Sequence, residues 1–281
     1  MRLLPKKFLF SKIFLTTSMV MASLPTSGAL ASSYDTTVLN DRPVLFLPMD
    51  AQHGVGVERD LVHNGRNGKY LPEGNNTVKT RMPNGDLATV FDGGTQYLEV
   101  ASAADLSIPR NGALTLEAWI RPDTLDFPAE EGDGYVYWAG KGESGEYEYA
   151  GRMYSYTNSA TPSRPNRISG YVFNLGGGLG SGSYFQDTTK RGEWIHVALV
   201  VDNRILSGNP SSGTVSIFKN GILRKTTPLS QFNVHPEPGQ APLRIATRDL
   251  HSFFKGAIGK FALYAYALSE AQLKAHFLKM K

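Results

Sequence analysis

The chain contains no cysteine among its 281 residues, and this absence excludes several kinds of chemistry. Disulfide bonds, thiol nucleophiles, cysteine-ligated zinc and iron–sulfur clusters all require a cysteine sulfur. The sequence also lacks a P-loop, a G-x-S-x-G elbow and an H-E-x-x-H zinc motif. A chain of this length can bury a sizeable core without covalent crosslinks, so its stability is expected to come from packing.

Long apolar runs are also scarce, and the single one lies at the N-terminus. Four basic residues precede an apolar stretch at residues 13–24, and the small-x-small sequence Ala29-Leu30-Ala31 follows it. This order predicts that residues 1–31 are a signal peptide and that the protein is secreted, either extracellular or periplasmic if the host has an outer membrane. A transmembrane anchor is the alternative, but the stretch is short for a bilayer. No membrane insertion is expected after cleavage.

Acidic and basic residues balance once the predicted signal peptide is set aside. The whole chain has 29 basic and 25 acidic residues, and residues 1–31 hold four of the basic ones and none of the acidic ones. The remaining chain therefore has 25 of each and no formal net charge. A basic face for nucleic acid is not expected from this balance, and nucleic acid is not an expected partner.

Short β-branched and aromatic runs, separated by turn residues, make up residues 43–281, which we expect to form one domain. Residues 114–120 alternate apolar and polar side chains, which predicts a strand with one face towards a core and one away from it. Residues 194–201 are almost continuously apolar and predict a central buried strand. Asn220-Gly221 between two such runs predicts a two-residue hairpin turn.

One stretch near the C-terminus has the signature of a helix. Ser269 and Gln272 have the spacing of a capping box, and Leu268 and Leu273 have that of a hydrophobic staple. Many strands with one short terminal helix predict an all-β sandwich of two antiparallel sheets rather than βαβ units. Residues 32–42 are expected to form a flexible lead-in to this domain.

Five segments, in their order along the chain, resemble the laminin-G-like domains of the concanavalin A-like lectin/glucanase jelly rolls. They are Leu45–Asp50, Asp60–Gly68, Phe91–Val100 with Leu114–Pro122, Gly192–Ala198 with Phe218–Gly221, and Phe254–Tyr264 with Ala267–Ser269. The clearest departure is Gly259-Lys260, where the family usually has Asp-Glu. The resemblance implies a jelly-roll β-sandwich. It implies much less about function, because the fold hosts lectins, adhesion domains and glycanases.

The resemblance also implies one structural calcium ion, because members of the family often bind one. Calcium takes oxygen ligands, and the candidate ligands are Asp60 and Asn64 in a glycine-containing turn, with Asp50 as a weaker third. The alternative is an Asx-type turn, in which these side chains bind their own backbone. Gly259 removes one carboxylate from the late strand of the family pattern, which counts against calcium.

Sugar recognition uses flat aromatic faces together with planar polar groups, and residues 147–184 are rich in both. The candidate carbohydrate-binding residues are Arg152, Tyr154, Tyr156, Arg167, Tyr171 and Tyr184. Alternate residues of a strand share a face, so the first three are expected to point together and the others to join them from neighbouring segments. The alternative is that the tyrosines suit a half-buried sheet surface and the arginines solvate its edge.

A glycanase of this fold would place carboxylates at alternate positions of one strand. Glu146 and Glu148 have that spacing, but Ala150 stands where the family pattern has a third acid, and His196 is expected to be a core histidine. We therefore expect a secreted, non-catalytic protein, not an enzyme, that binds an extracellular glycan or another cell-surface or matrix component. The alternatives are a protein-binding adhesion or scaffold domain and a divergent glycoside hydrolase or polysaccharide lyase.

Overall fold

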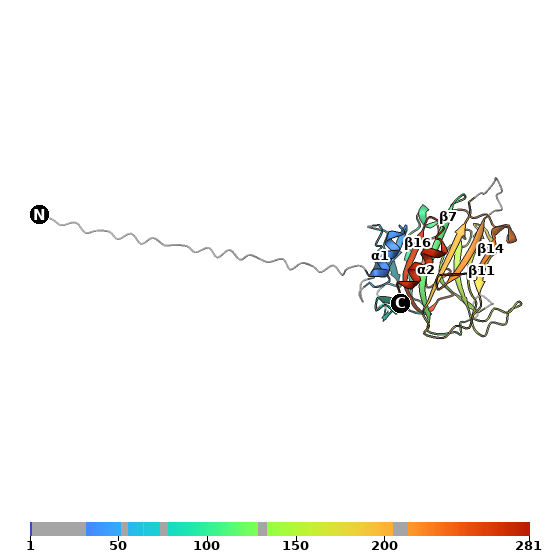
Figure 1. The fold of residues 1–281 in the computed structure, drawn as a ribbon, viewed down its shortest axis with the longest axis horizontal. Coiled ribbons are helices and arrows are strands. Elements are labelled where there is room, and N and C mark those ends of the chain that lie inside the picture. Colours follow the sequence, from blue (N-terminus) through green and yellow to red (C-terminus); the bar gives the residue numbers. More distant parts are fainter. Residues whose placement is uncertain (2–31, 52–55, 64, 74–77, 129–133, 205–212) are drawn as a thin grey trace. The chain divides into compact units, whose positions relative to one another are not determined.

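The computed structural model of the chain describes Met1 and residues 32–51, 56–63, 65–73, 78–128, 134–204 and 213–281 (Figure 1). Residues 2–31, which make up nearly all of the predicted signal peptide, lie outside this described part. The chain from Ser32 onward belongs to one compact unit. Its two antiparallel sheets enclose a single large apolar core, which confirms the all-β sandwich.

Sheet A has the strand order β14-β13-β12-β7-β16-β5-β4, and β1 also pairs with β16. Every pairing in it is antiparallel. Its strands are β1 (Leu45–Leu47), β4 (Val78–Arg81), β5 (Leu87–Asp92), β7 (Ala113–Pro122), β12 (Ile195–Asp202), β13 (Thr214–Lys219), β14 (Ile222–Pro228) and β16 (Lys255–Tyr264).

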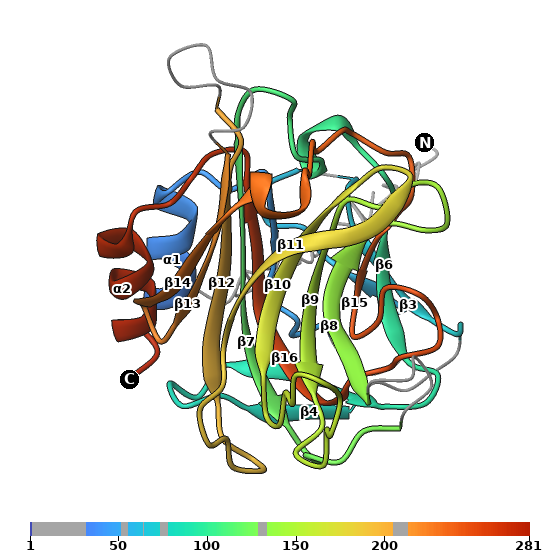
Figure 2. The same cartoon turned by 90° about the vertical axis from the view of Figure 1, so that its right-hand side faces the viewer.

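Sheet B has the order β11-β10-β9-β8-β15-β6-β3-β2, and its named strands also pair antiparallel. Strands β8 to β11 lie towards the viewer in Figure 2, away from the helices. The strands of sheet B are β2 (Val57–Glu58), β3 (Gly68–Leu71), β6 (Tyr97–Val100), β8 (Tyr135–Lys141), β9 (Tyr149–Tyr154), β10 (Ile168–Asn174), β11 (Gly177–Phe185) and β15 (Leu243–Ile245). Two short 3₁₀ turns, η1 (Ala104–Leu106) and η2 (Leu229–Phe232), lie in the connections.

The predicted strand pattern builds the core between the sheets. Leu114, Leu116 and Ile120 of β7 are fully buried there. Strand β12 pairs with β7 on one side and β13 on the other, which confirms it as a central strand. Asn220 and Gly221 join β13 to β14 with positive φ angles of 55° and 74°, as a type I′ hairpin turn requires.

The other face of β7 is buried as well, although the alternation predicted that it would point away from the core. Thr115, Glu117 and Trp119 are at most 3 % exposed. Helix α2 (Glu270–Leu278) covers this face and buries Leu273 against it. A second, smaller core therefore lies between sheet A and the helices, which appear together beside β13 and β14 in Figure 2.

Helix α2 begins as the sequence predicts. The Ser269 hydroxyl accepts a hydrogen bond from the Gln272 backbone N–H at 3.3 Å. The Gln272 side-chain oxygen accepts one from the Ser269 N–H at 3.1 Å, which completes the capping box. Among the described residues, none of the helices is long and apolar enough to span a bilayer.

The prediction that residues 32–42 form a flexible lead-in is wrong, because helix α1 (Ser33–Asn40) lies there. Ser32 caps this helix by accepting a hydrogen bond from the Asp35 N–H at 3.2 Å. Tyr34 and Val38 are fully buried in the smaller core beside sheet A. The helix is therefore part of the packed domain, and its order depends on that packing rather than on its own short sequence.

Lys260 is the main polar contact between α1 and sheet A. This residue is almost fully buried in β16, and its ammonium lies 2.6 Å from Asp35 of α1 and 2.9 Å from Asp86. Its positive φ of 53° marks an irregularity in β16, where the register with β7 shifts. The departure from the family pattern at Gly259-Lys260 thus accompanies the docking of α1.

Candidate functional site

The outer face of sheet B carries most of the predicted binding residues. Arg152 and Tyr154 of β9 share this face, because Met153 between them points into the core. The register places Tyr137 of β8 opposite Arg152, and Tyr135 opposite Tyr154. Cross-strand neighbours on one face are about 5 Å apart, so these side chains form a continuous floor.

A hollow of about 580 Å³ lies over this floor towards β10 and β11. Its lining includes five of the six predicted residues, namely Arg152, Tyr154, Arg167, Tyr171 and Tyr184. Lys225, Leu179 and Phe232 also line it, and the last two are exposed. We call this hollow the sheet B groove. The strand register thus brings together residues that lie up to 32 positions apart in the sequence.

Tyr156, the sixth predicted residue, does not line the groove. Strand β9 ends at Tyr154, and beyond it the Tyr156 N–H donates to the Leu125 carbonyl at 2.8 Å. The Tyr156 side chain is 54 % exposed. The prediction that Tyr156 shares a face with Arg152 is therefore wrong, because alternation holds only as far as the strand continues.

Cations and aromatic rings alternate within the groove. The Arg152 guanidinium lies 4.9 Å from the centroid of the Tyr171 ring. The Arg167 guanidinium and the Lys225 ammonium lie 3.8 and 3.9 Å from the centroid of the Tyr184 ring. Each contact of this kind contributes about 0.5–2 kcal/mol. The long side chains are therefore held in place before any ligand arrives, which lowers the entropy lost on binding.

The tyrosines of the groove differ in how much of each ring is exposed to a ligand. Tyr154 is fully buried and belongs to the floor, whereas Tyr171 and Tyr184 are half-buried and present part of their rings. The hydroxyls of Tyr154 and Tyr171 are 3.4 Å apart. Burial, and then the neighbouring Tyr154, raise the pKa of Tyr171 to about 12. Its phenol therefore stays neutral at ordinary pH and can both donate and accept a hydrogen bond.

A second hollow, of about 360 Å³, adjoins the groove and shares Arg152, Phe173 and Gly178 with it. Arg248 lines its other side and is 7 % exposed. Sequence reasoning missed Arg248 because it follows β15, which reaches the neighbourhood of β9 only by pairing with β8. No local pattern in the sequence connects these segments.

Glu146 and Glu148, the carboxylates considered for catalysis, anchor a loop instead. Glu148 is 1 % exposed, and its Oε1 accepts hydrogen bonds from the Lys141 ammonium at 2.5 Å and the Gly239 N–H at 2.9 Å. Glu146 accepts one from the Gln240 N–H at 2.7 Å. These contacts leave no open pair of carboxylates facing a common cleft, which a glycosidase mechanism requires.

Asp60, the candidate calcium ligand, is occupied by backbone donors. Its Oδ1 accepts from the N–H groups of Phe46 and Val62, both at 3.0 Å, and its Oδ2 accepts from the His63 N–H at 3.1 Å. This is the Asx-type turn, and its donors use the oxygens that calcium would need. Asn64 lies outside the described residues, and the described part of the chain holds no cluster of three metal-binding side chains. Asp60, the one of the two candidate ligands that the structure describes, therefore does not fit the ion.

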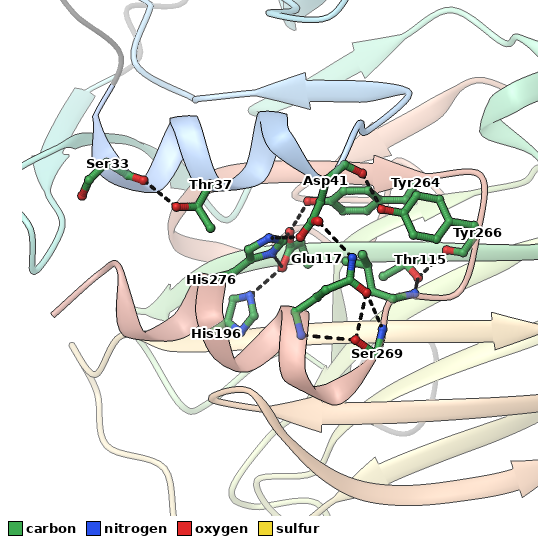
Figure 3. A network of polar contacts seen from close by, with 12 residues as sticks. Ser33, Thr37, Asp41, Thr115, Glu117, His196, Tyr264, Tyr266, Ser269 and His276 are labelled. Atoms are coloured by element: carbon green, nitrogen blue, oxygen red, sulfur yellow. Dashed lines mark hydrogen bonds and ion pairs between the residues drawn. The ribbon is translucent and has the colours of Figure 1, made fainter.

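A second polar cluster lies between sheet A and the helices (Figure 3). The Glu117 carboxylate lies 2.9 Å from His196 Nε2 and 2.9 Å from His276 Nδ1, and it accepts a hydrogen bond from the Tyr264 hydroxyl at 2.6 Å. His276 Nε2 in turn lies 2.9 Å from Asp41. Glu117 and both histidines are fully buried, so a ligand has no access to them. The cluster joins β7, β12, β16 and α2, and it confirms His196 as a core histidine.

This cluster makes the stability of the protein depend on pH. Burial alone would raise the pKa of Glu117, but His276 and His196 outweigh it and hold that pKa well below its usual value. Burial alone would lower the pKa of His276, but Glu117 and then Asp41 raise it above its usual value. The Glu117 contribution is therefore present above the unfolded carboxyl pKa of about 4.3 and is lost as pH falls through the lower folded value. The His276 contribution is complete below about pH 6.5 and is lost as pH rises through the higher folded value.

We expect the cluster's contribution to the free energy of unfolding to be greatest between about pH 4.5 and 6.5 and to decline above that range. Urea unfolding at a series of pH values from 5 to 9 measures it. His276→Gln should remove most of the alkaline decline, whereas His251→Gln, at an exposed position, should keep it. A decline of equal slope in the His276→Gln variant would contradict this assignment.

Residues 92–274, well over half of the chain, match a known family. The family model described as the concanavalin A-like lectin/glucanases superfamily, of the laminin-G type, matches residues 92–274. The chain belongs to this superfamily. No curated protein matches this chain.

Solved structures of the superfamily fold are similar to this chain at low sequence identity. Domain 4 of AbnA, a GH43 extracellular arabinanase from Geobacillus stearothermophilus, in complex with arabinotriose, has a TM-score of 0.56 at 15 % identity, over 83 % of this chain and 97 % of that one. The botulinum neurotoxin serotype D ligand binding domain in complex with N-acetylneuraminic acid has a TM-score of 0.57 at 12 % identity, over 85 % and 51 %. The serotype G binding domain gives 0.59 at 10 %, over 84 % and 50 %. This chain thus spans about half of the toxin chains, and the likeness shows the shared fold.

Proposed function

We propose that this protein is a secreted, non-catalytic lectin that binds an extracellular glycan in the sheet B groove. The observation that carries the proposal is the groove itself, where the half-buried rings of Tyr171 and Tyr184 lie beside Arg152 and Arg167. Aromatic rings can contact the C–H faces of sugars, and guanidinium groups donate hydrogen bonds in a fixed plane to sugar oxygens. The sheet holds these groups in place, so binding needs little rearrangement.

Two solved structures that share the fold support a sugar as the partner. They are complexes with arabinotriose and with N-acetylneuraminic acid, and both are described as a domain or a binding domain of a larger protein. A non-catalytic role is supported by Glu146 and Glu148, whose carboxylates hold the loop at residues 239–240. Binding rather than bond cleavage is therefore the function that the geometry favours.

Secretion is supported by the sequence of residues 1–31 and by the start of the folded unit. Cleavage after Ala31 would begin the chain at Ser32, which caps α1, and would leave every described helix and strand intact. Mass spectrometry of the exported protein should find an N-terminus at Ser32. Protein that keeps residues 1–31 would contradict export by signal cleavage.

A glycan array probed with purified residues 32–281 tests the proposal, once with calcium and once with a chelator. We expect selective binding to one class of glycan, unchanged by the chelator because Asp60 is engaged by backbone donors. Binding to no glycan in either condition would contradict the proposal and would favour a protein partner.

A matched pair of tyrosine variants locates the binding face. Tyr184→Ala removes a ring that lines the groove and should weaken glycan binding by about tenfold, the equivalent of about 1.4 kcal/mol. Tyr156→Ala removes an exposed ring outside the groove and should leave affinity unchanged. An equal loss in both variants would place the ligand elsewhere.

A further inference from the structure

Arg152 and Arg248, which line the hollow that adjoins the sheet B groove, both donate to the hydroxyl of the buried Tyr137. Arg152 Nη2 donates to the Tyr137 hydroxyl oxygen at 3.0 Å, and Arg248 Nη2 donates to the same oxygen at 2.9 Å. The two nitrogens are therefore less than about 6 Å apart. Like charges at this distance repel each other, and the repulsion is stronger where burial excludes water.

Neither arginine forms an ion pair with a carboxylate of the described part of the chain, although Glu143 and Asp249 line a neighbouring hollow together with Arg248. The lining of the hollow that adjoins the groove contains no carboxylate, and the Nε atoms of Arg152 and Arg248 are buried with no hydrogen-bond partner in the described part of the chain. The rings of Tyr137 and Tyr147 lie 4.7 and 4.9 Å from the Arg248 guanidinium. These rings stabilise the cation partly, but they carry no net charge to neutralise it.

Two other partly buried arginines, Arg244 and Arg121, are paired with carboxylates, whereas Arg167 of the adjoining groove donates to the Gln186 side chain. Arg244 lies 2.8 Å from Glu99, and Arg121 lies 2.9 Å from Asp123. Burying a cation without such a partner costs free energy. An anionic group of a ligand would supply the partner that Arg152 and Arg248 lack.

We propose that Arg152 and Arg248 form a subsite for the carboxylate or sulfate of an acidic glycan. The proposal rests on the proposed function, because it names the class of glycan that the groove selects. The two guanidinium groups can donate several charge-assisted hydrogen bonds to one planar carboxylate or one sulfate. The hollow and the groove share Arg152, Phe173 and Gly178, so a chain with its acidic group in the hollow continues along the groove past Tyr171.

Gly177 shapes the edge of this subsite. Its φ is 93°, and a Cβ atom at this position would lie 3.0 Å from the Tyr147 ring. The absence of a side chain lets the turn between β10 and β11 pass close to the ring that contacts Arg248. The hollow therefore stays open beside the two arginines.

Binding of matched glycan pairs to the unmodified protein tests the proposal without any variant. The pairs are oligogalacturonate and its methyl ester, a sialylated glycan and its desialylated form, and a sulfated oligosaccharide and its desulfated form. We expect at least one acidic member to bind about tenfold or more tightly than its neutral partner. A preference for the acidic member of the first or second pair indicates a carboxylate subsite. A preference confined to the third pair indicates a sulfate subsite.

Each outcome separates this proposal from the proposed function. Equal binding of acidic and neutral members, or binding of the neutral members alone, would overturn the acidic subsite and leave the lectin proposal standing. Binding of neither kind, together with a glycan array that shows no binding, would overturn both. Calorimetry measures all of these affinities in one buffer, so that ionic strength is constant.

Two charge-removing variants show whether the subsite or the general positive charge is responsible. Arg248→Gln should abolish the preference for the acidic member, while binding of the neutral member stays within about twofold. Lys225→Met removes one positive charge from the far part of the groove and should keep the preference. Near-ultraviolet circular dichroism checks that both variants are folded. An unchanged preference in folded Arg248→Gln would overturn the proposal.

Discussion

Replacing Glu117 with glutamine is expected to lower the free energy of unfolding by about 3–5 kcal/mol, because it removes the charged centre of a fully buried cluster. His196, His276 and Tyr264 all contact this carboxylate. Glutamine has a similar shape, but its NH2 group replaces one carboxylate oxygen. It therefore directs two N–H donors towards side chains that need an acceptor. Urea unfolding near pH 6, followed by tryptophan fluorescence, measures the loss.

Glu73→Gln is the matched control for this substitution. Glu73 pairs with Lys69 on the surface, where both side chains are largely exposed, and such pairs contribute little because solvent screens them. We expect no measurable change in the urea midpoint of Glu73→Gln. A Glu117→Gln variant as stable as this control would contradict the structural role of the buried cluster.

Lys260→Met should lower the free energy of unfolding by about 3–5 kcal/mol as well, since it breaks a buried ion pair and leaves its carboxylate partners unpaired. The effect should be concentrated in α1, because Lys260 contacts Asp35 of that helix. Hydrogen–deuterium exchange should become faster across Ser33–Asn40 before it changes in β7. Lys255→Met, at an exposed position of the same strand, is the control and should leave α1 protected. Unchanged exchange in α1 would contradict this account of its docking.

The features predicted correctly from the sequence are those that local patterns encode. Alternation identified β7, the apolar run identified β12, the Asn220-Gly221 pair identified the hairpin, and the cap at Ser269 identified α2. Helix α1 was missed because its main polar contact, between Asp35 and Lys260, joins residues 225 positions apart. The burial of Glu117 was missed for the same reason, since its cover comes from a helix at the other end of the chain.

The candidate site was predicted in part. Five of the six predicted residues line one groove because β9, β10 and β11 are consecutive strands joined by local connections. The sixth, Tyr156, was wrong because the end of β9 depends on a contact with Leu125. Arg248 was missed because strand order brings β15 beside β8, far from its place in the sequence. Nonlocal pairing thus assembled the part of the site that no short motif indicates.

Hydrogen–deuterium exchange with and without a bound oligosaccharide shows directly which face of the protein binds the glycan. The oligosaccharide is the tightest ligand found on the array, at a concentration that saturates the protein. If the sheet B groove is the site, protection should appear in residues 149–154 and 168–185, which form β9 to β11, and exchange in sheet A should be unchanged. Protection confined to residues 56–63 near Asp60, or to the strands of sheet A, would contradict a glycan site on sheet B.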